Sequence, residues 1–209
     1  MKVIRDVKEP EVRRAEIMQA ALSLFATKGY INTTTQDIID QVKISRGLLY
    51  YHFKNKEDIL FRMIEHYSEP IVRKLSAVAY DKDKTAIQKM KLFIESTLIS
   101  PEDITKEMTT LQDTVNLAQN RYMVDQFSHN FLSKIIPYFS HIIEQGNTEN
   151  VFHVEYPEET AAFLMTGYAF VGDELKTAYT DRERLNRYMF AFKKMLIQTL
   201  GIETLIFDE

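Results

Sequence analysis

The sequence predicts an all-α protein of about nine helices, in which an N-terminal helix-turn-helix domain of three helices precedes a larger helical domain. Helical periodicity runs through the chain, and no segment alternates apolar and polar residues as a half-buried strand would. Helix-start signals recur ahead of the apolar stripes. No repeat or long linker interrupts the pattern. We therefore expect domains at residues 1–55 and 56–209, joined by the long helix that begins at Lys56 rather than by a tether.

Composition excludes several classes of protein. With 45% hydrophobic and 27% charged residues, the chain can build a core and remain in solution. No apolar run approaches the roughly 20 residues that span a bilayer, and residues 1–9 lack the apolar stretch of a signal peptide. The absence of cysteine excludes disulfides, thiolate catalysis and Cys-based zinc sites. We expect a cytoplasmic protein that does not bind a membrane.

Charge is unevenly distributed. Residues 1–56 hold ten Lys and Arg against six Asp and Glu, a net charge of +4, whereas the remainder holds 16 against 24, a net charge of −8. A basic end on an acidic body indicates that contact with nucleic acid is confined to the N-terminal end.

The first helix is predicted over residues 10–28, because Pro10 suits an early helical position and Gly29 suits a left-handed residue after the last turn. Its apolar stripe consists of Ile17, Ala20, Ala21, Leu24 and Phe25. Further helix starts carry capping boxes at Thr34 and Asp37, Asn55 and Asp58, Ser100 and Asp103, and Thr180 and Glu183. The remaining helices are predicted at residues 35–42, 46–52, 56–80, 84–99, 102–119, 121–145, 157–179 and 182–200. Pro70 and Pro137 fall inside two of these and should kink or split them, as hinges or as fixed bends.

Residues 29–56 have the layout of a helix-turn-helix, with two short helices separated by residues 43–45. Its core positions are filled by Ile38, Val42, Ile44, Leu49 and Phe53. The second short helix also carries polar and aromatic groups that this core does not need: Arg46, Tyr50, Tyr51 and His52. In a major groove these groups would reach bases or phosphates, and Gly47 would permit close approach. Alternatively, the tyrosines pack against neighbouring helices.

This stretch resembles the DNA-binding domain of the TetR family of transcriptional regulators. The match covers about the first 60 residues, at Gly29, Tyr30, Thr33, Thr34, Ile38, Ser45, Gly47, Leu49, Tyr50, His52, Phe53, Lys56 and Leu60. The resemblance implies a repressor that binds palindromic operator DNA as a homodimer and is released by a small effector. Repression or activation depends on the position of the operator, which the protein sequence does not contain.

The resemblance also implies roles for single residues. Thr33, Thr34 and Thr35 begin the second helix and should hold phosphate, since helix N-termini favour anions. Ser45 should cap the third helix, with Arg46, Gly47 and Leu48 at the bases, and Tyr50, Tyr51, His52 and Lys56 at the phosphates. Two positions depart from the family pattern. Lys43 replaces a glycine and is expected to adopt the left-handed conformation at a cost of about 1 kcal/mol, and Ile39 replaces an alanine and should push the two short helices slightly apart.

The last two helices are the expected dimer interface, because small residues there permit close approach and the family pairs these helices in a four-helix bundle. Candidate interface residues are Ala162, Met165, Ala169, Tyr188, Phe192 and Leu196. Alternatively, both helices simply cover the core of the monomer.

The helix at residues 121–145 is apolar nearly all round and should run through the centre of its domain. With its neighbours it could line a pocket for an apolar or aromatic effector, at Met90, Phe93, Met108, Leu111, Tyr122, Phe127, Phe131, Tyr138 and Tyr168. Alternatively, these residues form a packed core. The effector would act by favouring a geometry in which the helix at residues 56–80 moves.

Two other functions remain open. A helical metal-dependent enzyme could use His129, His141 and Glu144, but the chain lacks H-E-x-x-H, a phosphate-binding glycine loop and a nucleophile elbow. We therefore expect no enzymatic activity, metal or cofactor. The other alternative is a helix-turn-helix protein that organises DNA or binds partner proteins without an inducer.

Overall fold

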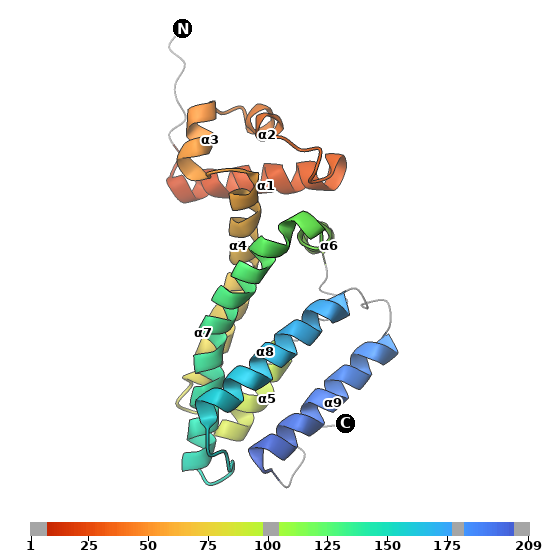
Figure 1. The fold of residues 1–209 in the computed structure, drawn as a ribbon. Helices are drawn as coiled ribbons and strands as arrows, with labels where there is room; N and C mark the ends of the chain where they lie inside the picture. The colour runs from red at the N-terminus through yellow and green to blue at the C-terminus, as the bar shows by residue number, and fades with distance from the viewer. Residues whose placement is uncertain (1–7, 98–104, 177–181, 203–209) are drawn as a thin grey trace. The chain divides into compact units, whose positions relative to one another are not determined.

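A computed structural model describes residues 8–97, 105–176 and 182–202, with only the backbone described for residues 171–176, 182 and 185. Within these ranges the chain is helical and contains no strand (Figure 1). Nine α-helices and one short 3₁₀ helix, η2, account for the described elements. Their bounds are α1 Pro10–Lys28, α2 Thr35–Val42, α3 Arg46–His52, α4 Lys56–Ala79, α5 Ala86–Thr97, α6 Lys106–Val115, η2 Ala118–Asn120, α7 Arg121–Thr148, α8 Pro157–Lys176 and α9 Arg182–Leu200. The predicted fold class and helix order are confirmed.

Local capping signals set the first helix ends. Thr34 caps α2 in a complete capping box, in which its hydroxyl accepts from Asp37 N and the Asp37 carboxylate accepts from Thr34 N. Asn55 caps α4 by accepting from Asp58 N at 2.7 Å, but Asp58 accepts in return from Lys54 N rather than from Asn55 N. The other two predicted boxes, at Ser100 and at Thr180, lie outside the described residues.

Two residues with positive φ connect the first three helices. Gly29 follows α1 with φ +82°, and its N–H donates to Phe25 O. Lys43 follows α2 in the left-handed conformation, with φ 59° and ψ 46°. The left-handed conformation expected for Lys43 is confirmed. Gly29 has the expected positive φ, but its ψ of 150° lies outside the left-handed helical region.

Contacts between Cα atoms divide the chain into two compact units. Unit 1 consists of Met1–Ser68 with Ile104–Phe127, and unit 2 of Glu69–Asp103 with Ser128–Glu209. The predicted boundary at residue 56 is the start of α4, whereas the units divide within α4 and again within α7. Pro70 and Pro137 both lie inside helices of unit 2.

Unit 1 is a helix-turn-helix with additional helical cover. Its buried core joins α1, α2, α3 and the start of α4 through Ile17, Phe25, Ile38, Leu49, Phe53 and Leu60. Of the predicted stripe of α1, Ile17, Ala21 and Phe25 are buried, whereas Ala20 and Leu24 are half-buried. The stripe omitted Leu22, which is buried as well. Leu111 of α6 belongs to the same core, and α6 packs on α1. The predicted domain boundary at residue 56 places α6 in the larger domain, whereas its contacts place it in unit 1.

Unit 2 has a core built around α7, as the apolar character of this helix predicts. Phe139, Ile142 and Ile143 are fully buried there among residues of α4, α5, α8 and α9. The end of α7 approaches the following segment closely, because a Cβ atom built on Gly146 would lie 1.9 Å from Cδ2 of Phe152. Only glycine therefore fits position 146 with the buried phenylalanine in its present place.

Helices α8 and α9 lie side by side in unit 2 (Figure 1). None of the helices in the described ranges is both long enough and apolar enough to span a bilayer.

Candidate nucleic-acid interface

The third helix is held by its cap and by one buried side chain. Ser45 precedes it with an extended backbone, and the Ser45 hydroxyl accepts a hydrogen bond from Leu48 N at 3.2 Å. Leu49 points into the core of unit 1. A cap of this kind contributes about 1 kcal/mol. The predicted capping role of Ser45 is thus observed, and the burial of Leu49 determines which face of α3 remains in water.

The outer face of α3 exposes cationic and phenolic groups. Arg46 and Tyr50 are exposed, and the Arg46 guanidinium carbon lies 5.6 Å from the centroid of the Tyr50 ring. Tyr51 keeps 75% of its surface accessible. The alternative interpretation of the sequence was that the tyrosines pack against neighbouring helices. The exposure of Tyr51 argues against it for that residue, whereas Tyr50 is 42% exposed. Guanidinium and phenol groups on one exposed helix face can donate to phosphates and base edges.

Gly47 lies on this exposed part of α3, and a Cβ atom built there would meet nothing within 4 Å. Neither packing nor a positive φ requires glycine at this position. Nothing within the unit explains the glycine. The absence of a side chain at position 47 agrees with close approach of another molecule to α3.

Leu48 and His52 are half-buried rather than fully exposed. The pKa of His52 lies below its ordinary value because of burial, together with the nearby positive charges of Arg14 and Arg13. Its Nδ1 atom is buried and has no hydrogen-bond partner within the described part of the chain. Burial therefore favours the neutral imidazole, and a contact of His52 with phosphate stays a prediction.

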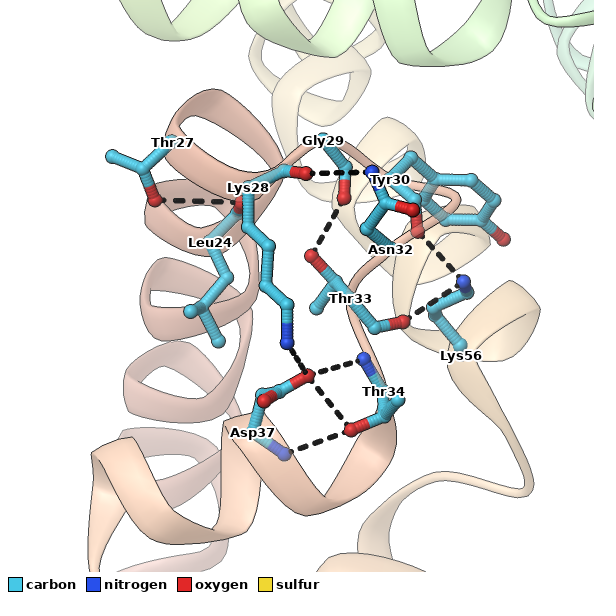
Figure 2. Close-up of polar contacts among 10 residues, drawn as sticks. All are labelled: Leu24, Thr27, Lys28, Gly29, Tyr30, Asn32, Thr33, Thr34, Asp37 and Lys56. Carbon is cyan, nitrogen blue, oxygen red and sulfur yellow. Dashed lines mark hydrogen bonds and ion pairs between the residues drawn. The ribbon is translucent and has the colours of Figure 1, made fainter.

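The N-terminus of α2 lies next to α3. The Thr35 hydroxyl is 3.4 Å from the Tyr50 hydroxyl, a contact that also lowers the Tyr50 pKa. Thr34 is exposed and is locked by Asp37, whose Oδ2 accepts from both Thr34 N and Thr34 Oγ1 at 2.7 Å. Lys28 Nζ lies 2.7 Å from the same oxygen (Figure 2). The pKa of Asp37 is held well below its usual range, first by Lys28 and then by Thr34.

Thr33 and Lys56 have internal partners instead of the open positions that were expected. Thr33 is 1% exposed, and its hydroxyl donates to Gly29 O at 2.7 Å. Lys56 Nζ donates to Tyr30 O at 2.7 Å and to Thr33 O at 3.0 Å. Thr33 is therefore closed to a phosphate in this conformation because its side chain is buried and bonded, and two donors of Lys56 are occupied. The sequence gives no signal for these hydrogen bonds, because their acceptors are main-chain carbonyls, which every residue has.

The predicted dimer residues divide between the core and the surface of unit 2. Met165, Phe192 and Leu196 are buried in the core of the unit, Ala162 and Ala169 are half-buried, and Tyr188 is exposed. The most exposed large apolar side chains in the described parts of α8 and α9 are Phe163, Phe170 and Phe190, which are 82%, 66% and 70% exposed. The sequence identifies Phe163 and Phe170 as apolar residues of α8, but it does not show that they lie on the exposed face of the helix.

The predicted pocket residues belong to both units. Met108, Leu111, Tyr122 and Phe127 are in unit 1, where Leu111 is buried and Tyr122 exposed. In unit 2, Met90 and Phe93 are fully buried, whereas Phe131, Tyr138 and Tyr168 are half-buried. The Tyr168 hydroxyl lies 2.6 Å from that of Thr97, and its ring is 4.5 Å from the ring of Phe192. No three His, Cys, Asp or Glu side chains within the described ranges are grouped as a metal site would require.

A capped recognition helix with exposed arginine and tyrosine, beside the capped N-terminus of a second short helix, defines a helix-turn-helix DNA-binding protein. Comparison with known proteins agrees. The family described as "Bacterial regulatory proteins, tetR family" matches residues 17–63, and "Tetracyclin repressor-like, C-terminal domain" matches residues 103–195. The chain belongs to the TetR family of transcriptional regulators, which is not a family of enzymes.

Individual relatives extend this result. YfiR of Bacillus subtilis (strain 168), an uncharacterized HTH-type transcriptional regulator, is 29% identical over 183 residues, which cover 82% of this chain and 83% of YfiR. HbdR of Aromatoleum sp. (strain CIB), also an HTH-type transcriptional regulator, is 35% identical over 86 residues, 39% of this chain and only 38% of HbdR. A solved complex of SmeT with triclosan matches the fold with a TM-score of 0.67 at 20% identity, over 94% of this chain and 95% of that one.

Proposed function

We propose that this regulator is a repressor that binds a palindromic operator as a homodimer, in the cytoplasm where the DNA lies. The exposed face of α3 carries the proposal, because Arg46 and Tyr51 are presented to solvent by a helix whose other face is fixed by Leu49. One such helix reads few base pairs. Two copies about 34–36 Å apart would meet successive major grooves and read a site with twofold symmetry.

The exposed phenylalanines of unit 2 support the dimer. Phe163 and Phe170 are seven residues apart and so lie on one side of α8, with exposed Gly167 between them. A Cβ atom on Gly167 would meet nothing within 4 Å, so this glycine leaves room for a second helix. Because large contiguous apolar surfaces are rare on monomers, we assign this face of α8, with Phe190 of α9, to contact between two copies.

The hydroxyl pair of Thr97 and Tyr168 supports an effector site in unit 2. Both groups are partly buried, and the pair lies beside the Phe192 ring. A small aromatic molecule with one polar group could replace one hydroxyl of this pair as partner of the other, while its ring packs on the aromatic side chains. SmeT, which shares the fold, forms a complex with triclosan. An effector that prefers one of two geometries would release DNA by a shift of population.

The operator proposal is tested by selecting duplexes from a random-sequence library with the full-length protein. We expect a palindromic consensus. Arg46→Ala should then weaken binding at least tenfold at fixed salt, since a base or phosphate contact contributes about 1–3 kcal/mol. Lys82→Ala, which removes one exposed positive charge from unit 2, serves as the control. Equal affinity for all duplexes would instead favour a DNA-organising protein.

The effector proposal is tested by thermal stabilisation with phenols and other small aromatic compounds, triclosan included, since a ligand of the native state raises the midpoint of unfolding. A true effector must also release the selected duplex. Tyr168→Phe should weaken both responses, and Tyr156→Phe, at an exposed position outside the helices, should not. If compounds stabilise the protein but none releases DNA, the protein regulates or organises DNA without such an inducer.

A further inference from the structure

Lys56 makes three interactions at the start of α4, all within unit 1. Its ammonium donates to Tyr30 O at 2.7 Å and to Thr33 O at 3.0 Å, and it lies 4.2 Å from the centroid of the Tyr30 ring. Figure 2 shows the ammonium group between the two carbonyl oxygens. Burial lowers the Lys56 pKa below its ordinary value. An ammonium group has three N–H donors, so two of the three are already in use.

The two acceptors belong to the loop between α1 and α2. Thr33 is fixed further, because both its N–H and its hydroxyl donate to Gly29 O. The next residue, Thr34, is the N-cap of α2. The opposite side of this loop is tied through Lys28 and Asp37. Lys56 therefore supplies two hydrogen bonds between α4 and a loop that ends where the exposed N-terminus of α2 begins. A longer contact of 3.4 Å, from the Tyr30 hydroxyl to Glu57 Oε1, joins the same two elements.

We propose that Lys56 is a positioning residue for DNA binding: it ties the start of α4 to the loop of residues 30–33 and so presents the N-terminus of α2 to phosphate. This inference rests on the proposed DNA-binding function. It differs from the role that the family resemblance implies, in which the ammonium itself contacts phosphate. To do that, the side chain would give up both hydrogen bonds to the loop. Tyr30 O would keep only its 3.3 Å bond from Thr33 N, and Thr33 O would lose its ammonium donor in a site where Thr33 is buried.

Two measurements on the full-length protein separate these roles. Lys56→Met should accelerate amide hydrogen exchange of Thr33 and Thr34 at least tenfold in the free protein, because the loop loses its two shortest hydrogen bonds to α4. It should also weaken binding to the selected duplex at least tenfold. The slope of log K against log salt should stay nearly unchanged, whereas loss of a phosphate contact lowers its magnitude by about 0.9.

Lys54→Met is the matched control, because Lys54 is an exposed lysine two residues away on the same segment. It removes the same charge and should leave exchange of Thr33 and Thr34 unchanged. A Lys56→Met protein with normal loop exchange and a slope reduced by about 0.9 would make Lys56 a phosphate ligand and overturn the proposal. Unchanged affinity would overturn it too.

A double-mutant cycle with Thr34→Ala tests whether Lys56 acts through the cap of α2. If it does, Lys56→Met should cost less affinity in the Thr34→Ala background than in the wild type. Additive losses would contradict the proposal. If Lys56→Met unfolds unit 1, Lys56→Arg provides the same test. This variant should show partial protection of the loop amides together with partial affinity for the duplex. Full affinity without protection of the loop amides would contradict the proposal. If the wild type selects no duplex at all, operator binding fails, while the exchange data still report on the loop.

Discussion

The exposed faces of the two units differ in chemistry. Along α3 of unit 1 the exposed groups include Arg46, Tyr50 and Tyr51, which water solvates well through their polar ends. On α8 and α9 of unit 2 they include three phenylalanines, which have no polar group. The first face can remain hydrated and exchange water for directional bonds to DNA. The second gains stability only by being covered. The exposed face of α3 therefore suits a reversible contact with DNA. The exposed faces of α8 and α9 suit a lasting contact between two copies of the chain.

Removing the apolar character of α8 should have the largest effect. We expect Phe163→Glu to convert the proposed dimer into a monomer, as measured by light scattering. A side chain central to an interface contributes about 2 kcal/mol or more, and twofold symmetry counts it twice. The resulting loss of about 4 kcal/mol weakens association roughly 1000-fold, with a matching loss of operator binding. Tyr156→Glu, at another exposed aromatic residue, is the control. A Phe163→Glu protein that remains dimeric would place the interface elsewhere.

Substitution of two glycines of unit 2, one in its interior and one on its surface, should have different effects. Gly146→Ala should lower the free energy of unfolding by about 1–3 kcal/mol, because its methyl group would overlap the buried Phe152 ring. Gly167→Ala adds a methyl group in open space. It should leave the stability of the monomer unchanged or slightly raised, but should impair dimerisation. Urea denaturation and light scattering of both variants check this contrast, and equal destabilisation by the two would contradict it.

How far each region could be predicted depends on the range of the signals. Pro10, Gly29, Thr34 and Ser45 act within a few residues, so the bounds of α1, α2 and α3 follow from the sequence. The left-handed Lys43 is expected instead from the resemblance to the TetR family, which usually has glycine at this turn position. The carbonyls that hold Lys56 are main-chain groups present at every residue, and nothing in the sequence distinguishes them.

The α8 helix shows a second limit. It has apolar residues on more than one side, with Leu164 and Met165 buried and Phe163 exposed. Periodicity identifies the helix, but only the positions of the neighbouring helices decide which apolar side faces the core. For this reason Met165, Phe192 and Leu196 were assigned to the dimer interface, although they pack inside the unit.

A smaller effect is expected at the cap of α2 when the pH is lowered. The Asp37 pKa is depressed in the folded protein by Lys28 and Thr34. Its contribution to stability is therefore present above the unfolded pKa of about 3.9 and is lost as the pH falls through the lower, folded value. The urea midpoint of Asp37→Asn should be below that of the wild type at pH 7, and the difference should shrink towards pH 3. A difference that stays constant from pH 7 to pH 3 would contradict this assignment.

At Gly47, folding and DNA binding place opposite requirements on one atom, the Cβ that glycine lacks. Because a Cβ atom there meets nothing within the described structure, alanine at this helical position should raise the free energy of unfolding by up to about 1 kcal/mol. The same methyl group should hinder approach to a major groove. Thermal unfolding and duplex binding of Gly47→Ala should therefore change in opposite directions. A screen for heat resistance alone would therefore be expected to select alanine at position 47, whereas a screen for operator binding would be expected to select glycine.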